Sequence, residues 1–245
     1  MVLSIEPGIS DAEWGCSYYE IANALGVPEI KLCFVKVSDL SEFSKKLTHS
    51  VLDDSWMTKL DKGSRRQYDY TVKETAGVLV DIFTKTSGSG MIGAEFGELM
   101  VSIGSARALE QVFSHSRLPI AELWKPQVKQ NEGFDFHTVC TADLINFGEA
   151  KFSGQTNPHG NAISQIGDFI AVDKHFRDRG HLEKIVGSQS IEHLDDEKFG
   201  VIAAFSINSA NPLAIFKNAL QSAIEFVGAK SVAGFYLVGV SESAK

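Results

Sequence analysis

The sequence predicts an α/β protein in which helices flank a mixed β-sheet. Segments rich in β-branched and apolar residues alternate with segments of helical character, and two of the strand segments follow one another directly. The chain has 245 residues, of which 44% are hydrophobic. It is therefore long enough for one large domain, or for one domain with an added lobe.

The N-terminal third is expected to contain two helical regions and two strands. Residues 11–25 are expected to be helical. Residues 29–37 follow Pro28 and are apolar and β-branched, which predicts a strand. The polar stretch 38–75 is expected to hold one or two short helices, and the apolar run at 77–85 a further strand.

The middle of the chain is expected to contain helices followed by a pair of strands. A Gly/Ser turn is expected at 87–90, and helices at 93–102 and 105–114. The segments 133–140 and 143–152 are expected to form two adjacent strands.

The C-terminal third is expected to alternate between helix and strand. One or two helices are expected over 161–185, and buried strands over 199–207 and 231–240. Between these strands, Asn211 is expected to begin a helix that ends near Gly228. Three isoleucines share one face of the first helical segment: Ile163, Ile166 and Ile170.

Charge and cysteine content exclude several classes of protein. The net charge of −8 argues against a protein that binds nucleic acid through its own basic surface. Three cysteines without a CxxC pair exclude a disulfide framework, a zinc ribbon and a CxxC redox site. Residues 1–10 show no signal-peptide pattern, and no apolar run is long enough to span a membrane. The expected location is therefore the cytoplasm, without membrane association.

Most catalytic motifs are absent from the sequence. Residues 88–93 read GSGMIG, which formally matches the GxGxxG loop of dinucleotide-binding proteins. However, such a site needs a second strand that ends in an acidic residue about 20 positions further on, and no such strand is expected here. No Walker A loop or GxSxG motif occurs, and the seven histidines are scattered. The sequence therefore gives little support for a nucleotide-binding oxidoreductase, which would rest on these glycines alone.

The strand pair at 133–152 carries a group of charged residues that suits metal-dependent chemistry. Residues two apart in a strand share a face, so Glu149 and Lys151 should project together, and Asp135 should meet them from the neighbouring strand. Two carboxylates and the backbone carbonyl of Ala150 are suitable ligands for a hard cation such as Mg²⁺ or Mn²⁺. The ion would polarise a phosphodiester, and the ammonium of Lys151 would stabilise developing negative charge.

The triplet acid-x-Lys alone carries little information, because about two such triplets are expected by chance in a chain of this composition. Three occur, beginning at Glu29, Asp196 and Glu149. The second lies in a very polar run, and the first stands at a strand entrance with no strand-borne carboxylate before it. Only Glu149 lies inside an apolar strand that follows a strand-borne aspartate. The structural alternative is an edge strand whose Glu149 and Lys151 simply face solvent.

Further residues are candidates for accessory roles. Glu98, on the predicted helix at 93–102, is a candidate to complete the metal shell or to hold a metal-bound water, with Glu95 competing for that role. The alternative is a glutamate on the helix surface. Gln165 lies on the helix after the second strand and faces either the site or solvent. Lys125 and Lys129 precede the first strand and are candidates for phosphate contact, although a solvated loop is the better interpretation.

The chain resembles the PD-(D/E)xK nuclease superfamily in three short stretches: an upstream helical GEL, then GFDFH, then GEAKF. The resemblance implies a restriction-endonuclease-like mixed sheet flanked by helices over 76–245, with an added N-terminal α/β segment, 1–75, packed on it. It also implies metal ligands at Asp135 and Glu149, a catalytic Lys151, and accessory roles for Glu98 and Gln165. The residue before Asp135 departs from the usual pattern, because Phe134 replaces the proline.

More narrowly, the spacing is similar to the HamA nucleases of Hachiman anti-phage defence and to the related AbpA proteins. That resemblance implies a DNA nuclease that works with a HamB-like, helicase-like ATPase. The alternative is a catalytically silent subunit that keeps the nuclease fold and regulates the helicase partner. The complete set of Asp135, Glu149 and Lys151 favours the nuclease, because a silent subunit has no need for all three.

Overall fold

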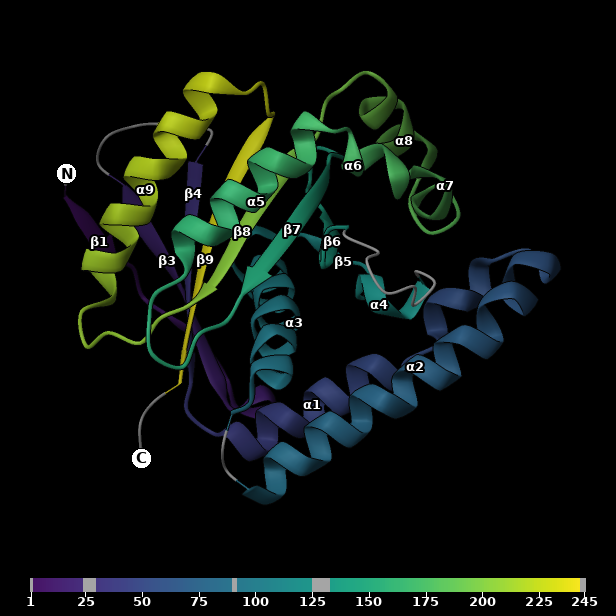
Figure 1. Ribbon diagram of the computed structural model, residues 1–245, viewed down its shortest axis with the longest axis horizontal. Helices are drawn as coiled ribbons and strands as arrows, with labels where there is room; N and C mark the ends of the chain where they lie inside the picture. Colours follow the sequence, from purple (N-terminus) through teal and green to yellow (C-terminus); the bar gives the residue numbers. More distant parts are fainter. Residues whose placement is uncertain (1, 24–29, 90–91, 125–132, 243–245) are drawn as a thin grey trace.

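The computed structural model describes residues 2–23, 30–89, 92–124 and 133–242, which form one mixed β-sheet with helices on both faces (Figure 1). The strands are β1 (Leu3–Ile5), β2 (Ile9–Asp11), β3 (Cys16–Asn23), β4 (Ile30–Val37), β5 (Ser116–Arg117), β6 (Phe136–Val139), β7 (Ile145–Lys151), β8 (Gly200–Ser206) and β9 (Gly234–Glu242). Their order in the sheet is β1-β3-β4-β9-β8-β7-β6-β5, and β2 also pairs with β3.

The helices fall into nine α-helical and two 3₁₀ segments within the described residues. The α-helices are α1 (Leu40–Leu52), α2 (Lys62–Ser89), α3 (Ala94–Phe113), α4 (Ala121–Trp124), α5 (His159–Ala171), α6 (Lys174–Arg177), α7 (Arg179–Leu182), α8 (Ser188–Asp195) and α9 (Pro212–Ala229). The 3₁₀ segments are η1 (Ala12–Trp14) and η2 (Ser55–Lys59). None of these described helices is both long and apolar enough to cross a bilayer.

The centre of the sheet is parallel and its two sides are antiparallel. Strands β4, β9, β8 and β7 run parallel, whereas β3 joins β4 and β6 joins β7 in antiparallel pairs. Every residue of β8 is buried, as its unbroken apolar sequence requires in a strand covered on both faces. Helix α3 crosses one face, and α5 and α9 cover the other (Figure 1).

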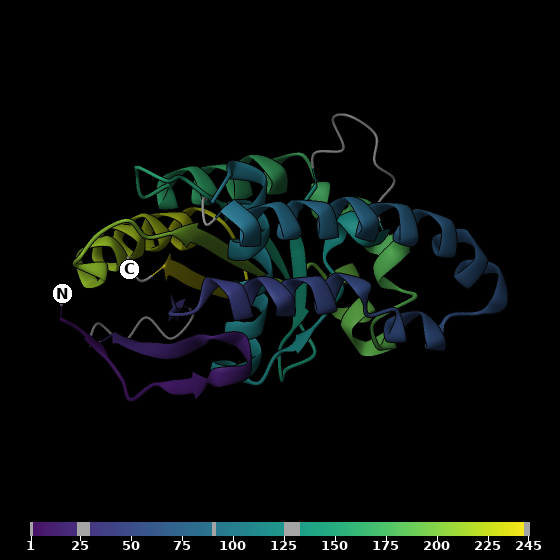
Figure 2. The same cartoon turned by 90° about the horizontal axis from the view of Figure 1, so that it is seen from below.

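Helices α1 and α2 pack side by side and extend beyond the sheet (Figures 1 and 2). Asp39 begins α1 because its carboxylate accepts hydrogen bonds from the backbone N–H groups of Ser41 and Glu42, at 3.0 and 3.1 Å. The long helix α2 buries one stripe of its surface, and its opposite face is exposed. The pair therefore forms an arm beside the sheet.

The structure confirms the coarse α/β prediction and most of the expected strands. The segments 29–37, 199–207 and 231–240 contain β4, β8 and β9, and the adjacent strands expected over 133–152 are β6 and β7. Asn211 caps α9, since its side chain accepts a hydrogen bond from the N–H of Ala214 at 3.2 Å. The segment 161–185 contains most of α5 together with α6 and α7.

The helix expected over 11–25 is wrong, because η1 and β3 occupy most of this segment. Cys16, Tyr18 and Ile21 are buried while Glu20 is exposed, and all of them pair with β4. The pairing of residues 16–21 with β4 outweighs the local helical character of this segment. Sheet formation therefore decides the structure here.

The strand expected over 77–85 is also wrong, because these residues continue α2. The buried apolar residues of α2 lie three or four positions apart, which is the spacing of one helical face. They are Tyr68, Val72, Ala76, Leu79 and Phe83. The apolar run belongs to this longer helical stripe, which begins in the stretch that was expected to be merely polar.

The boundaries inside the chain also differ from expectation. The helices expected at 93–102 and 105–114 are one continuous α3, and residues 87–89 of the expected turn belong to α2, while residue 90 lies outside the described residues. Residue 75, the expected end of an added N-terminal segment, lies within α2. Strands β3 and β4 belong to the same sheet as β9. The N-terminal segment thus supplies part of the sheet itself.

Gly148 offers a test of the packing between β6 and β7. It pairs with Phe136, and a Cβ at Gly148 would lie 2.5 Å from Cζ of that buried ring. We expect Gly148→Ala to lower the free energy of unfolding by about 1–3 kcal/mol, because a close-packed core tolerates no added carbon. Urea unfolding should show a lower midpoint. Gly160→Ala is the control, since its Cβ would meet open space; equal midpoints for both variants would contradict this account.

Candidate functional site

Asp135 fastens the start of β6 to the end of β7. Its backbone N–H donates to the carbonyl of Gly148 at 2.9 Å, and its Oδ2 accepts from the N–H of Ala150 at 2.7 Å. The N–H and C=O groups of one strand residue point to the same side. The carbonyl of Ala150 therefore also faces the side on which Asp135 lies.

Glu149 and Lys151 project from the same face of β7, as their spacing predicts. Nζ of Lys151 lies 2.7 Å from Oε1 of Glu149. The side chain of Glu149 is 1% exposed, whereas that of Lys151 is 24% exposed. Within the described part of the chain, Oε2 of Glu149 is buried and has no hydrogen-bond partner. A buried carboxylate oxygen without a donor is free to accept a cation or a proton.

The electrostatics of this group follow from burial and from the crowding of carboxylates. Burial, and then the charge of Asp135, raise the pKa of Glu149 to about 8, although its bond with Lys151 acts in the opposite direction. Burial lowers the pKa of Lys151, but the bond with Glu149 and the nearby negative charges outweigh burial and leave that pKa above its ordinary value. Lys151 is therefore a cation at neutral pH, beside a carboxyl group that holds its proton readily.

Glu98 belongs to the same electrostatic group as Glu149 and Lys151. It is an exposed residue near the start of α3, and its charge raises the pKa values of both Glu149 and Lys151. A close contact brings α3 to this position: a Cβ on Gly97 would lie 2.2 Å from the ring of Phe152, just after β7. Glu98 thus acts on Glu149 and Lys151 electrostatically from the neighbouring helix, and its role in a metal shell stays a prediction.

The edge-strand alternative for Glu149 and Lys151 does not hold. Strand β7 lies inside the sheet, between β6 and β8, and Glu149 is buried. By contrast, Asp196 and Lys198 of another acid-x-Lys triplet form an exposed pair, 3.2 Å apart. Glu29 lies outside the described residues. Position in the structure therefore separates the buried Glu149 triplet from the exposed Asp196 triplet.

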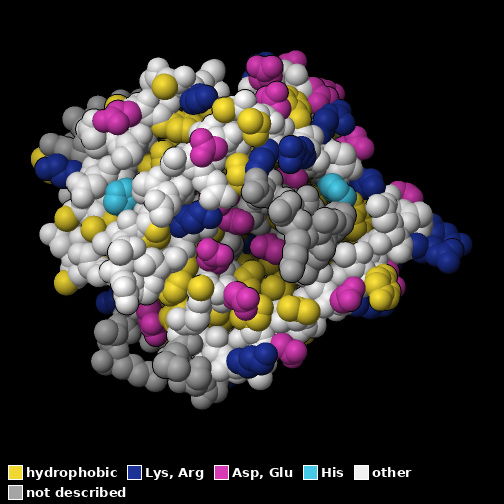
Figure 3. Space-filling view, viewed as in Figure 1, with side chains coloured by type: hydrophobic (Ala, Val, Ile, Leu, Met, Phe, Trp, Pro, Cys, Tyr) yellow, Lys and Arg dark blue, Asp and Glu magenta, His cyan; other side chains and the backbone are white. Residues whose placement is uncertain are grey.

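An open groove of about 720 Å³ lies beside Lys151, along one face of α5. Gln165 lines this groove together with Lys151, so the structure brings these two predicted residues to one place. Figure 3 shows the same face of the molecule, where Asp and Glu side chains gather near the end of β7. Lys125 and Lys129 lie outside the described residues.

Sequence reasoning missed the four other polar or charged residues that line the groove: Asn161, Ser164, Asp168 and Lys174. The first three lie on the face of α5 opposite the isoleucine stripe, and their spacing of three and four residues was visible in the sequence. No local pattern indicates Lys174, which follows the end of α5. It reaches the groove through the turn between α5 and α6.

The donor set suits a cation that needs few protein ligands. No cluster of three or more His, Cys, Asp or Glu side chains is arranged to hold a metal within the described ranges. Asp135 and Glu149 nevertheless offer two neighbouring carboxylates, and the carbonyl of Ala150 offers a third oxygen. Mg²⁺ is commonly held by one or two carboxylates, with water and substrate phosphate completing its shell. The residues present therefore fit Mg²⁺ better than a metal that needs a full protein cage.

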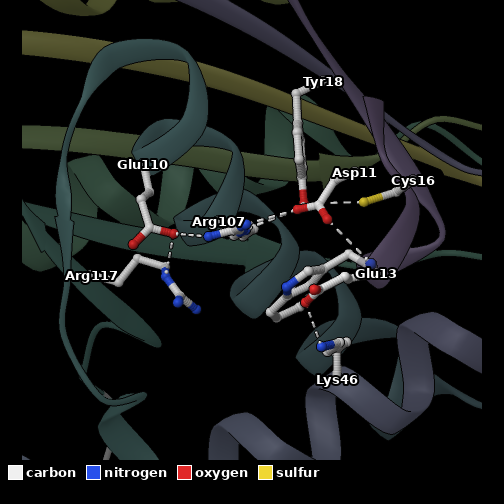
Figure 4. Close-up of polar contacts among 9 residues, drawn as sticks. Asp11, Glu13, Cys16, Tyr18, Lys46, Arg107, Glu110 and Arg117 are labelled. Carbon is white, nitrogen blue, oxygen red and sulfur yellow. Dashed lines mark hydrogen bonds and ion pairs between the residues drawn. The ribbon is translucent and has the colours of Figure 1, made fainter. Parts of the chain in front are cut away.

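A second charged cluster, beside β2 and α3, is internally paired (Figure 4). Arg107 of α3 binds Oδ2 of Asp11 at 2.8 Å and also contacts Glu110. Glu110 in turn binds Nε of Arg117 at 2.9 Å, and both guanidinium groups lie against the ring of Trp14. Because its charges are matched, this cluster fastens α3 to the N-terminal strands and to β5.

The nucleotide-binding reading of GSGMIG loses its structural context. Residues 77–85 before it are helical rather than a strand, whereas a dinucleotide loop must connect a strand to a helix. Residues 90–91 of the motif lie outside the described residues.

The resemblance to PD-(D/E)xK nucleases stays a prediction, since comparisons of the chain with family models, curated proteins and solved structures found no match.

Proposed function

We propose that this chain is a Mg²⁺- or Mn²⁺-dependent DNA nuclease, the effector subunit of an anti-phage defence complex with a helicase-like ATPase. One observation carries the proposal. Asp135 and Glu149 stand side by side at the end of β7, Glu149 keeps one buried oxygen without a partner, and Lys151 lies 2.7 Å from the other. This combination of acids and an ammonium is suited to metal-dependent phosphodiester hydrolysis.

Asp135, Glu149 and the carbonyl of Ala150 would hold the metal ion, with Glu98 close enough to contribute electrostatically. When bound, the ion would supply Lewis-acid polarisation of the phosphodiester. Lys151 would place its ammonium against the phosphate and stabilise the charge that develops there. Gln165, on the adjoining wall of the groove, would help to position the backbone.

The charge distribution supports a partner that delivers DNA. The chain carries a net charge of −8, and carboxylates outnumber cations around the site. Non-specific DNA affinity comes mainly from cationic contacts with phosphate, so the isolated chain should bind DNA weakly at physiological salt. A helicase-like ATPase engaged on DNA would raise the local concentration of substrate. Tight DNA binding by the chain alone would argue against this dependence.

Cleavage of supercoiled plasmid tests the nuclease activity. The wild-type chain should convert plasmid to nicked or linear forms with Mg²⁺ or Mn²⁺, alone or with the ATPase encoded by a neighbouring gene. Glu149→Ala/Lys151→Ala should remove this activity. The matched control is Asp196→Ala/Lys198→Ala, which alters an exposed acid-x-Lys triplet outside the site and should cut like the wild type.

The same experiment separates the nuclease from a silent regulatory subunit. Activity that requires the metal and disappears only in the site variant supports the nuclease. If no combination of chain, metal and ATPase cuts DNA, while the ATPase still binds both the wild type and the site variant, the chain is the silent subunit.

A further inference from the structure

The groove beside Lys151 runs along a single face of α5. The lining residues from Asn161 to Val172 are spaced by three or four positions, so they form one continuous stripe. At 1.5 Å per residue, this stripe is roughly 16 Å long. Three of its six side chains are neutral and polar, two are apolar and one is acidic. A lysine stands at either end of the lining: Lys151 from β7 and Lys174 from α6.

Lys174 is an unusual residue in this wall. Its residue surface is only 7% exposed, and its Nζ lies 4.0 Å from the centroid of the Phe169 ring. Burying an ammonium is unfavourable unless other groups stabilise the charge, and the face of an aromatic ring is one such group. Phe169 also lines the groove. The cation is therefore held at a fixed place in the groove wall.

The groove is fixed at its other end by the loop that joins β7 to α5. Ser153 exchanges hydrogen bonds with Ser206 of β8: its N–H donates to Oγ at 2.9 Å, and its carbonyl accepts from Oγ at 3.1 Å. Asn208 also donates from Nδ2 to the carbonyl of Thr156 at 2.7 Å. These bonds fasten the loop between β7 and α5 to the end of β8 and so help to set the position of α5 relative to β7.

We propose that this groove binds the DNA strand that carries the scissile phosphodiester, with Lys174 contacting a second phosphate of that strand. The inference rests on the proposed function and extends it to the path of the substrate. A stripe of roughly 16 Å corresponds to about five nucleotides of one strand, measured along the duplex axis at 3.4 Å each. Neutral side chains such as Asn161 and Ser164 suit sugar and phosphate contacts that carry no base specificity.

Binding measured without cleavage tests this path. We would titrate fluorescein-labelled DNA, single-stranded and duplex, with the chain in metal-free buffer at several salt concentrations, and follow anisotropy. Lys174→Gln should weaken binding and reduce the slope of log K against log salt by about 0.9 for duplex or about 0.7 for single strands. The form of DNA that shows the change identifies which one enters the groove.

Matched variants separate the groove from general charge effects. Lys198→Gln removes the same charge from an exposed site outside the groove and should leave the slope unchanged. Because Lys174 is buried, its substitution could disturb folding, so a second pair of variants is needed. Ser164→Asp in the groove should weaken DNA binding, whereas Ser188→Asp on α8 should not. Asp168→Asn removes a negative charge from the groove and should strengthen binding.

The outcomes for the groove and for the nuclease are independent. The groove is supported if the Lys174, Ser164 and Asp168 variants shift affinity in these directions, even if the wild type never cuts DNA. The groove is overturned if the wild type cuts plasmid while Lys174→Gln and Ser164→Asp, both folded by circular dichroism, bind DNA with unchanged affinity and slope.

Discussion

An Asp135→Asn variant is expected to fold like the wild type and to lose DNA cleavage by about 10²- to 10⁴-fold, the effect of several kcal/mol of transition-state stabilisation. The side chain of Asp135 has two separable roles. Its Oδ2 accepts the N–H of Ala150 at 2.7 Å, which fastens β6 to β7. Its negative charge is the feature that a divalent cation needs.

Asparagine preserves the first role and removes the second. The amide oxygen of Asn can accept the same N–H bond, but it carries no charge. Asp135→Ala removes both, so it should also lower stability by about 1–3 kcal/mol, because the amide of Ala150 loses its acceptor in a partly buried place. The pair of variants therefore distinguishes a catalytic carboxylate from a structural one.

Plasmid cleavage and urea unfolding should be measured on the same preparations. A stable, inactive Asn variant and a destabilised, inactive Ala variant would support the assignment. An Asn variant that cuts DNA at the wild-type rate would show that Asp135 serves only to join the strands.

The predicted site depended on information that is local in the sequence. Asp135 directly precedes β6, and Glu149 and Lys151 lie on β7, which a short turn joins to β6. The side-chain alternation expected along these two segments was therefore enough to place the three residues together. The position of β7 inside the sheet was not local information. It depends on β8, which follows some 50 residues later, and only this pairing shows that Glu149 is buried.

The predictions for 11–25 and 77–85 were wrong because residues outside each segment decide its structure. In each case a short segment was interpreted without the rest of the sheet or helix to which it belongs. Strand β3 is specified by its pairing with β4, and the end of α2 by an apolar stripe that begins near Tyr68. Lys174 was missed for a related reason, because a turn in the chain, rather than a repeat, brings it into the groove.

A Glu149→Gln variant is expected to be more stable than the wild type at high pH and no more stable at low pH. The pKa of Glu149 rises from an ordinary value of 4.5 to about 8 in the folded chain, first because of burial and then because of Asp135. Between these values the unfolded chain releases the proton that the folded chain retains. The stability of the wild type therefore falls as pH rises through this window.

Glutamine is neutral at every pH, and its amide oxygen can still accept the bond from Lys151. Near pH 8 the variant should exceed the wild type in stability by on the order of a few kcal/mol, since each pKa unit corresponds to about 1.4 kcal/mol. Near pH 4 the difference should vanish. Thermal unfolding across this range, without divalent cations, provides the measurement.

Added Mg²⁺ should make the wild type more stable than Glu149→Gln, and this reversal links stability to the proposed chemistry. The ion binds the ionised carboxylate, so it must displace the proton of Glu149, and its stabilising effect on the wild type should grow with pH. Glu149→Gln should gain little at any pH, because one of its two carboxylates is gone. The opposite result is a wild type whose melting temperature does not change with Mg²⁺ at pH 8, while the Gln variant still melts at a higher temperature. Glu149 would then be a destabilising buried acid that binds no cation. If Mg²⁺ stabilises the wild type only as pH rises, the ionised Glu149 that destabilises the metal-free fold is also the group that binds the metal.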